Sequence, residues 1–112
     1  MSRSLKLVIN NNNLISESEI FFNKEELKVI LNLYSKMVSA GSWKDYGLSI
    51  SSKQVSFCVF KNSAEKAKYR ICKNFKPANK NLKYLLTDTN GKILKNSNNL
   101  ENLIKNTRWK NF

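Results

Sequence analysis

The stretch Asn23-Lys-Glu-Glu-Leu-Lys-Val-Ile-Leu-Asn-Leu-Tyr-Ser-Lys-Met-Val-Ser-Ala-Gly41 is the clearest structural signal in the sequence. Asn23 followed by Glu26 is a variant of the capping box, in which each side chain satisfies a backbone amide of the other. Phe22 before the cap and Leu27 after it match the hydrophobic staple. The final glycine suits the left-handed conformation that ends many helices. The stretch therefore predicts an amphipathic helix over residues 24–40.

Apolar residues recur along this stretch at helical spacing, with polar residues on the opposite side. The stripe expected to face the core consists of Leu27, Ile30, Leu31, Tyr34, Met37 and Val38. Val29 and Leu33 widen the stripe beyond one face. They are expected to pack under the N-terminal arm, and the alternative is a contact between two copies of the chain.

From Tyr46 onward the hydrophobic period changes to two residues, which is typical of β-strands. The alternation predicts strands over residues 46–50, 54–60, 66–72, 82–87 and 92–95. Asn90-Gly91, between the last two strands, is a strong hairpin signal. Asn98 with Glu101 repeats the capping-box pattern and indicates a short helix after the sheet.

This order of elements predicts an α+β fold in two layers. It consists of an N-terminal amphipathic helix, an antiparallel sheet of about four to five strands and a short C-terminal helix. At 112 residues and 13.0 kDa the chain is expected to form a single domain. Its predicted divisions are a flexible N-terminal arm at residues 1–19, the α+β domain at residues 20–106 and a basic C-terminal tail at residues 107–112.

The sequence favours a cytoplasmic location. Its apolar run near the start, Leu7-Val8-Ile9, is too short for a signal peptide, and no stretch approaches the length of a membrane span. Cys58 and Cys72 lie fourteen residues apart and are expected to be buried thiols in a reducing compartment.

The charge is large and unevenly distributed. The chain has 20 Lys and Arg against 8 Asp and Glu, a net charge of +12. Residues 1–52 hold six basic and five acidic side chains, whereas residues 53–112 hold fourteen basic and three acidic ones. Such asymmetry favours an anionic partner, namely nucleic acid or a ribonucleoprotein. The alternative is coding bias, because the chain also contains seventeen Lys and seventeen Asn.

Several segments resemble one family of short bacterial proteins. The segments are Phe22–Leu27, Lys36-Met37-Val38, Trp43-Lys44-Asp45-Tyr46, Tyr69-Arg70-Ile71 and Gly91–Lys95. Together they are similar to domain-of-unknown-function family 2794, found in alphaproteobacteria, over roughly residues 21–104. The resemblance implies a cytoplasmic bacterial protein and carries no activity with it.

The residue inventory argues against an enzyme. The chain has no histidine, which removes imidazole as a catalytic base or metal ligand. The adjacent carboxylates Glu25 and Glu26 lie in a first helical turn, where the helix dipole and the cap explain them. Two cysteines cannot complete a zinc site unaided. We therefore expect no catalytic residues, no metal and no cofactor.

The candidate binding surface lies on the third predicted strand. Lys66, Lys68 and Arg70 alternate, so they are expected to project from one sheet face while Ala67, Tyr69 and Ile71 face the helices. Phe60 and Cys58 would share the outer face with these cations, as a basic surface with an aromatic ring suited to nucleic acid. The residues expected to extend this surface into the following loop are Lys73, Phe75, Lys76 and Lys80. The alternative is that the arm or the last helix covers Phe60 and Cys58 and that the lysines form a solvated sheet edge. Arg108 and Lys110 in the tail are a separate candidate, and Trp109 between them is expected to fold back onto the core.

A protein–protein interaction module, such as an accessory subunit of a larger complex, is the alternative function. It would use Val29 and Leu33 or the corner formed by Trp43, Asp45 and Tyr46. At that corner we expect Trp43 and Tyr46 to enter the core and Asp45 to bond backbone amides.

Overall fold

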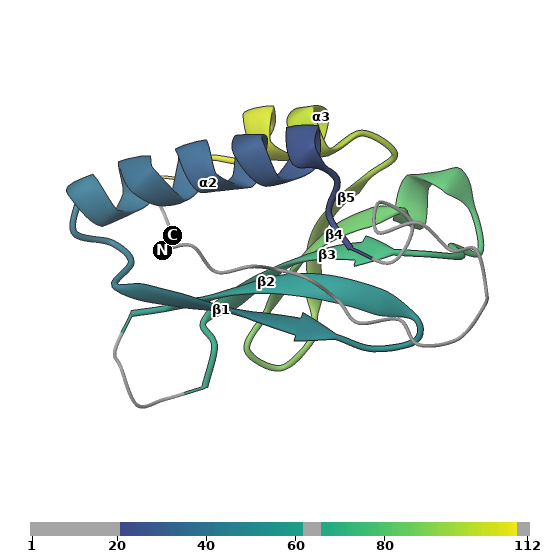
Figure 1. The fold of residues 1–112 in the computed structure, drawn as a ribbon, viewed down its shortest axis with the longest axis horizontal. Helices are drawn as coiled ribbons and strands as arrows, with labels where there is room; N and C mark the ends of the chain where they lie inside the picture. Colours follow the sequence, from purple (N-terminus) through teal and green to yellow (C-terminus); the bar gives the residue numbers. More distant parts are fainter. Residues whose placement is uncertain (1–20, 62–65, 110–112) are drawn as a thin grey trace.

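The computed structural model describes residues 21–61 and 66–109, which form two layers (Figure 1). Two helices lie on one face of a five-stranded antiparallel sheet with strand order β1-β2-β3-β4-β5. The elements in chain order are α2 (Lys24–Ser39), β1 (Asp45–Ile50), β2 (Gln54–Phe60), β3 (Tyr69–Asn74), the 3-10 helix η1 (Lys80–Leu82), β4 (Tyr84–Asp88), β5 (Ile93–Ser97) and α3 (Leu100–Lys105). The predicted α+β fold class is confirmed.

Helix α2 begins at the predicted residue and ends close to the predicted glycine stop. The Asn23 side chain accepts a hydrogen bond from the Glu26 amide at 2.8 Å, and Glu26 Oε1 accepts one from the Asn23 amide at 2.7 Å. Gly41 has a φ of +80°, in the left-handed region that an L side chain adopts at a cost. The capping box and the glycine stop are both confirmed, and the helix ends one residue before the predicted boundary.

The face that α2 buries differs from the predicted stripe. Ile30, Leu33 and Met37 are buried, whereas Leu31 and Val38 are 37% and 40% exposed. The buried face is rotated toward Leu33 because α3 packs beside α2 on that flank (Figure 1). The prediction for Leu31 and Val38 was wrong, since helical spacing alone does not say which flank meets a second helix.

The core lies between α2, α3 and the helix-facing side of the sheet. Val55, Phe57, Ile71 and Leu86 are almost completely buried there. The Tyr46 ring stacks on Phe57 with a centroid distance of 4.9 Å. The side chains of β2 point to the two faces in the alternation that the sequence indicated.

Strand β3 covers Tyr69–Asn74, whereas the predicted strand covered residues 66–72. Its pairing begins where Tyr69 lies opposite Val59 of β2. It continues to Asn74, because that side chain bonds Gln54 of β2 at 2.7 Å and the Leu82 carbonyl at 2.6 Å. Interstrand contacts therefore shift this strand two to three residues along the chain.

Two details at the C-terminal end differ from prediction. Asn99, and not Asn98, caps α3, with its side chain accepting from the Asn102 amide at 3.0 Å. Trp109 packs edge-on against Trp43 at 5.8 Å and donates its indole N–H to the Ile104 carbonyl at 2.8 Å. The packed part of the domain therefore extends past the predicted boundary at residue 106, and the prediction that Trp109 folds back onto the core is confirmed.

The predicted flexible arm at residues 1–19 lies outside the described residues. None of the helices described here combines the length and the apolar character that crossing a bilayer requires.

Candidate nucleic-acid interface

Cations from three loops, namely α2–β1, β2–β3 and β4–β5, lie at one end of the sheet. The first basic cluster consists of Lys44, Lys61, Lys66, Lys68, Arg70 and Lys92. Five of them are exposed, and Arg70 is half-buried on the sheet face that points away from the helices. The β2–β3 connection and the β4–β5 hairpin lie at this same end of the sheet (Figure 1).

Hydrogen bonds to backbone carbonyls hold the members of the first basic cluster near one another. The Lys44 amide donates to the Phe60 carbonyl at 2.8 Å, and the Lys68 amide donates to the Val59 carbonyl at 2.7 Å. The Thr89 hydroxyl, in the β4–β5 hairpin, donates to the Ala67 carbonyl at 3.1 Å. These bonds join the starts of β1 and β3 and the hairpin into one rim.

The carboxylates on this rim serve the backbone. Asp45 Oδ1 accepts from the Tyr46 amide at 2.8 Å. Asp88 Oδ1 accepts from the Asn90 and Lys92 amides, each at 2.9 Å, and so fixes the hairpin turn. Within residues 21–61 and 66–109 neither carboxylate forms an ion pair with a member of the first basic cluster. The cations of the rim are therefore not neutralised by these two groups.

Arg70 and Phe60 lie on the outer sheet face, as predicted, but the surface around them is more closed than expected. Arg70 lies opposite Cys58, and its guanidinium contacts the Cys58 thiol. Cys58 is buried and Phe60 is half-buried. The ring of Phe60 lies beside Gly47, where an added Cβ would come within 3.7 Å. Phe60 thus borders the first basic cluster with part of its ring accessible.

A second basic cluster lies at the opposite end of the sheet (Figure 1). It consists of the exposed Lys53, Lys76 and Lys80, with Phe75 half-buried among them. The Phe75 amide donates to the Lys53 carbonyl at 3.0 Å, which joins the β3–β4 loop to the β1–β2 turn. The six-residue β3 separates the two clusters by about 20 Å at about 3.3 Å per residue. The single surface expected from Lys66 to Lys80 is therefore divided in two.

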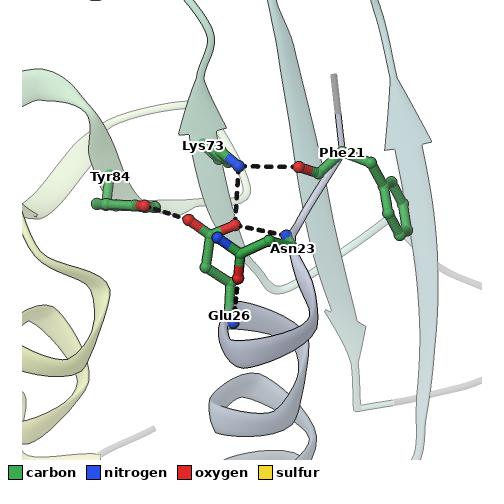
Figure 2. A network of polar contacts seen from close by, with 5 residues as sticks. All are labelled: Phe21, Asn23, Glu26, Lys73 and Tyr84. Atoms are coloured by element: carbon green, nitrogen blue, oxygen red, sulfur yellow. Dashed lines mark hydrogen bonds and ion pairs between the residues drawn. The ribbon is translucent and has the colours of Figure 1, made fainter. Parts of the chain in front are cut away.

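Lys73 belongs to neither cluster, and the expectation that it extends the basic surface was wrong. Its ammonium is buried and donates to Glu26 Oε1 at 2.8 Å and to the Phe21 carbonyl at 2.9 Å (Figure 2). The Tyr84 hydroxyl donates to the other oxygen of Glu26. Lys73 therefore ties β3 to the start of α2 and is not available to a partner.

The Glu26 carboxylate is held in its ionised form. Burial alone raises its pKa, but hydrogen bonds from Lys73, Tyr84 and the Asn23 amide outweigh burial, so the pKa lies below its ordinary value. Burial, and then the bond to Glu26, raise the pKa of Tyr84. A perturbed carboxylate often marks a reactive site. Here three structural bonds to its neighbours explain the perturbation.

The sequence contained one signal for this network. Tyr69, Ile71 and Lys73 alternate, so Lys73 occupies the helix-facing side that the pattern assigned to its neighbours. A lysine at such a position needs a buried counter-charge. Glu26 supplies it from 47 residues away.

Most of the residues expected at a protein interface are buried or half-buried in the structure. Trp43 and Leu33 are buried, and Tyr46 and Val29 are half-buried. Asp45 is exposed and bonds the Tyr46 amide, as predicted. Arg108 is exposed beside α3, while Lys110 lies outside the described residues.

A polar pocket of about 470 Å³ lies between the starts of α2 and α3. Glu25 and Glu101 line it together with Lys83 and Tyr84. Because carboxylates line it, this pocket does not suit an anion. The anion-binding surface is better sought at the basic clusters.

The thiols and carboxylates of the described residues are the groups that a nucleophile or a metal site would require. Burial raises the pKa of both Cys58 and Cys72, which keeps the thiols protonated at neutral pH. Over residues 21–61 and 66–109, no three Cys, Asp or Glu side chains converge as a set of metal ligands.

Comparison with known proteins gives a family and nothing more specific. Searches of curated proteins and of solved structures find no match. The family model described as "Protein of unknown function (DUF2794)" matches residues 20–104, which include α2, the whole sheet and most of α3. The chain therefore belongs to the DUF2794 family of proteins of unknown function.

Proposed function

We propose that the protein is a non-enzymatic binding protein for nucleic acid, either free or within a ribonucleoprotein, and that the first basic cluster makes the contact. The observation that supports this most directly is that, among the described residues, the cluster's cations form no ion pair. The two carboxylates beside them bond backbone amides. A polyanion is the partner that such a rim attracts.

The distribution of charge along the sequence supports the same partner. Residues 66–87 contain seven Lys and Arg and no Asp or Glu. Only Lys73 of these seven forms a salt bridge within the described residues. Side chains that bind phosphates through charge alone recognise the backbone of a nucleic acid, so we expect binding with little sequence preference.

The first basic cluster has six cations against three in the second, and Phe60 adds an aromatic ring at its border. The half-buried ring of Phe60 borders Lys61 and the start of β1, where an unpaired base has a surface on which to stack. Single-stranded or looped RNA is therefore expected to bind more tightly than a duplex of equal charge.

The test compares matched double variants of the two clusters. Lys66→Ser with Lys68→Ser removes two exposed cations from the first cluster, and Lys76→Ser with Lys80→Ser removes two from the second. Both pairs are exposed, so both variants are expected to retain the circular dichroism spectrum and the melting temperature of the parent.

Binding to a labelled single-stranded RNA, a duplex and purified ribosomes is then measured at low salt. We expect the first double variant to weaken binding about ten-fold or more, and the second to weaken it less. Absence of binding by the parent protein at low salt would refute the proposal. An equal loss in both variants would show that the first cluster is not the interface.

A further inference from the structure

Among residues 21–61 and 66–109, strand β1 is an edge of the sheet. The strand order of these residues places it at the end, where it pairs with β2 over Asp45–Ile50. The Ser51 amide donates to the Gln54 carbonyl at 2.9 Å. In an antiparallel pair every second residue bonds the neighbouring strand, so the odd-numbered residues of β1 bond β2. The amides and carbonyls of Leu48 and Ile50 therefore point away from the sheet. An unpaired strand edge of this kind is a template for a further strand.

The edge lacks the devices that usually block pairing. Its sequence, Asp-Tyr-Gly-Leu-Ser-Ile, contains no Lys and no Pro, and its register with β2 is regular. The opposite edge, β5, carries Lys95 and pairs with β4 through an irregular register. There the Asn96 side chain also bonds the Asn81 carbonyl beside η1 at 2.9 Å. The two edges of the sheet are therefore not equivalent.

An apolar side chain accompanies this edge. Ile50, on the helix-facing side of β1, is 44% exposed. A strand added to β1 would shield Ile50 and complete the hydrogen bonds of the edge.

The charge of the chain around β1 indicates which partner can pair with this strand. Residues 21–53, which include α2, β1 and the turn after it, carry five Lys against three Asp and Glu. Two molecules of net charge +12 repel each other less through this part of the chain than through the more basic remainder. We propose that β1 pairs with β1 of a second copy of this chain, in a symmetric antiparallel arrangement centred on Leu48.

The register follows from the ladder. Centred on Leu48, Tyr46 of one copy lies opposite Ile50 of the other. The outward amides of Leu48 and Ile50 then meet the outward carbonyls of Leu48 and Tyr46 in the other copy. This register keeps the helices of both copies on one face of a continuous sheet. It also brings Asp45 of each copy toward the 51–53 turn of the other, where Lys53 supplies the opposite charge. The interface is isologous, as two-fold symmetry requires.

The dimer is expected to tighten as salt is raised. Screening weakens the repulsion between two basic molecules, whereas binding to a polyanion weakens under the same change. The salt dependence therefore separates self-association from the proposed binding of nucleic acid. Because the interface is a short edge, we expect a dissociation constant in the micromolar range or weaker.

Sedimentation equilibrium of the nucleic-acid-free protein tests the proposal at about 50 mM and about 500 mM salt. The full chain is expected to approach twice its mass of 13.0 kDa, with a larger dimer fraction at the higher salt. Ile50→Lys, which places a like charge on each side of the interface, and Ile50→Pro, which removes an outward amide, should each weaken association at least ten-fold. Pro is tolerated at an edge position whose amide faces solvent.

Ile93→Lys is the matched control, because Ile93 is 48% exposed on the opposite edge of the sheet. It should leave the dimer unchanged. The proposal is overturned if the parent stays monomeric up to about 1 mM. An equal loss of association in Ile93→Lys would overturn it too, as would a dimer that weakens when salt is raised.

Discussion

Replacing Lys73 by Met is expected to destabilise the protein by about 3 kcal/mol. The two partners of this ion pair are only 5% and 8% exposed, so removal of Lys73 leaves the Glu26 carboxylate buried without its counter-charge. Breaking a buried pair from one side costs about 3–5 kcal/mol. We expect the lower value because the Asn23 amide and the Tyr84 hydroxyl still donate to Glu26. In a domain of this size the loss corresponds to about 15 °C in melting temperature.

Urea unfolding followed by circular dichroism measures this loss. The matched control is Lys76→Met, at an exposed lysine two positions beyond the end of β3, which should stay within about 0.5 kcal/mol of the parent. Glu26→Gln keeps the capping box but removes the charge that Lys73 pairs with. The double variant with Lys73→Met should therefore lose less stability than the two single variants lose together. If Lys73→Met is as stable as Lys76→Met, the ion pair does not stabilise the fold and the reasoning fails.

Two further predictions concern acid stability and the C-terminal anchor. The pKa of Glu26 is lowered by folding, so its contribution is complete above the ordinary value of 4.5 and is lost as pH falls through the lower folded value. Melting temperatures measured from pH 7 to pH 3 should therefore converge for the parent and Glu26→Gln, and a constant gap would contradict this. Trp109→Ala removes the contact with Trp43 and should cost about 1–2 kcal/mol by thermal unfolding. Arg108→Ala, at an exposed neighbour, should cost less than about 0.5 kcal/mol, and equal losses would count against the anchor.

Local sequence rules predicted the elements of the fold well. The boundaries of α2 depend on Asn23 and Gly41, whose cap geometries are decided within a few residues. The hairpin at Asn90-Gly91 depends on Gly91, which has a φ of +86°. The faces of β2 follow from strict alternation of side chains.

The features that the sequence did not predict depend on contacts between segments that are distant along the chain. The buried face of α2 depends on where α3 docks, so Leu31 and Leu33 exchanged their expected environments. A strand boundary depends on pairing with neighbours, which moved β3 along the chain and divided the predicted binding surface. Lys73 looked like a surface cation because its partner, Glu26, is far away in sequence.

The salt dependence of nucleic-acid binding by the first basic cluster is the most direct test of the proposed function. If its six cations each engage one phosphate, the logarithm of the binding constant should fall against the logarithm of salt with a slope of about −5 for a duplex. Fluorescence anisotropy with a labelled duplex gives this slope for the parent and for Lys66→Ser with Lys68→Ser. We predict that the double variant loses about two units of slope, one for each phosphate contact. A slope near zero in the parent, or an unchanged slope in the variant, would contradict the assignment of the first basic cluster as the interface.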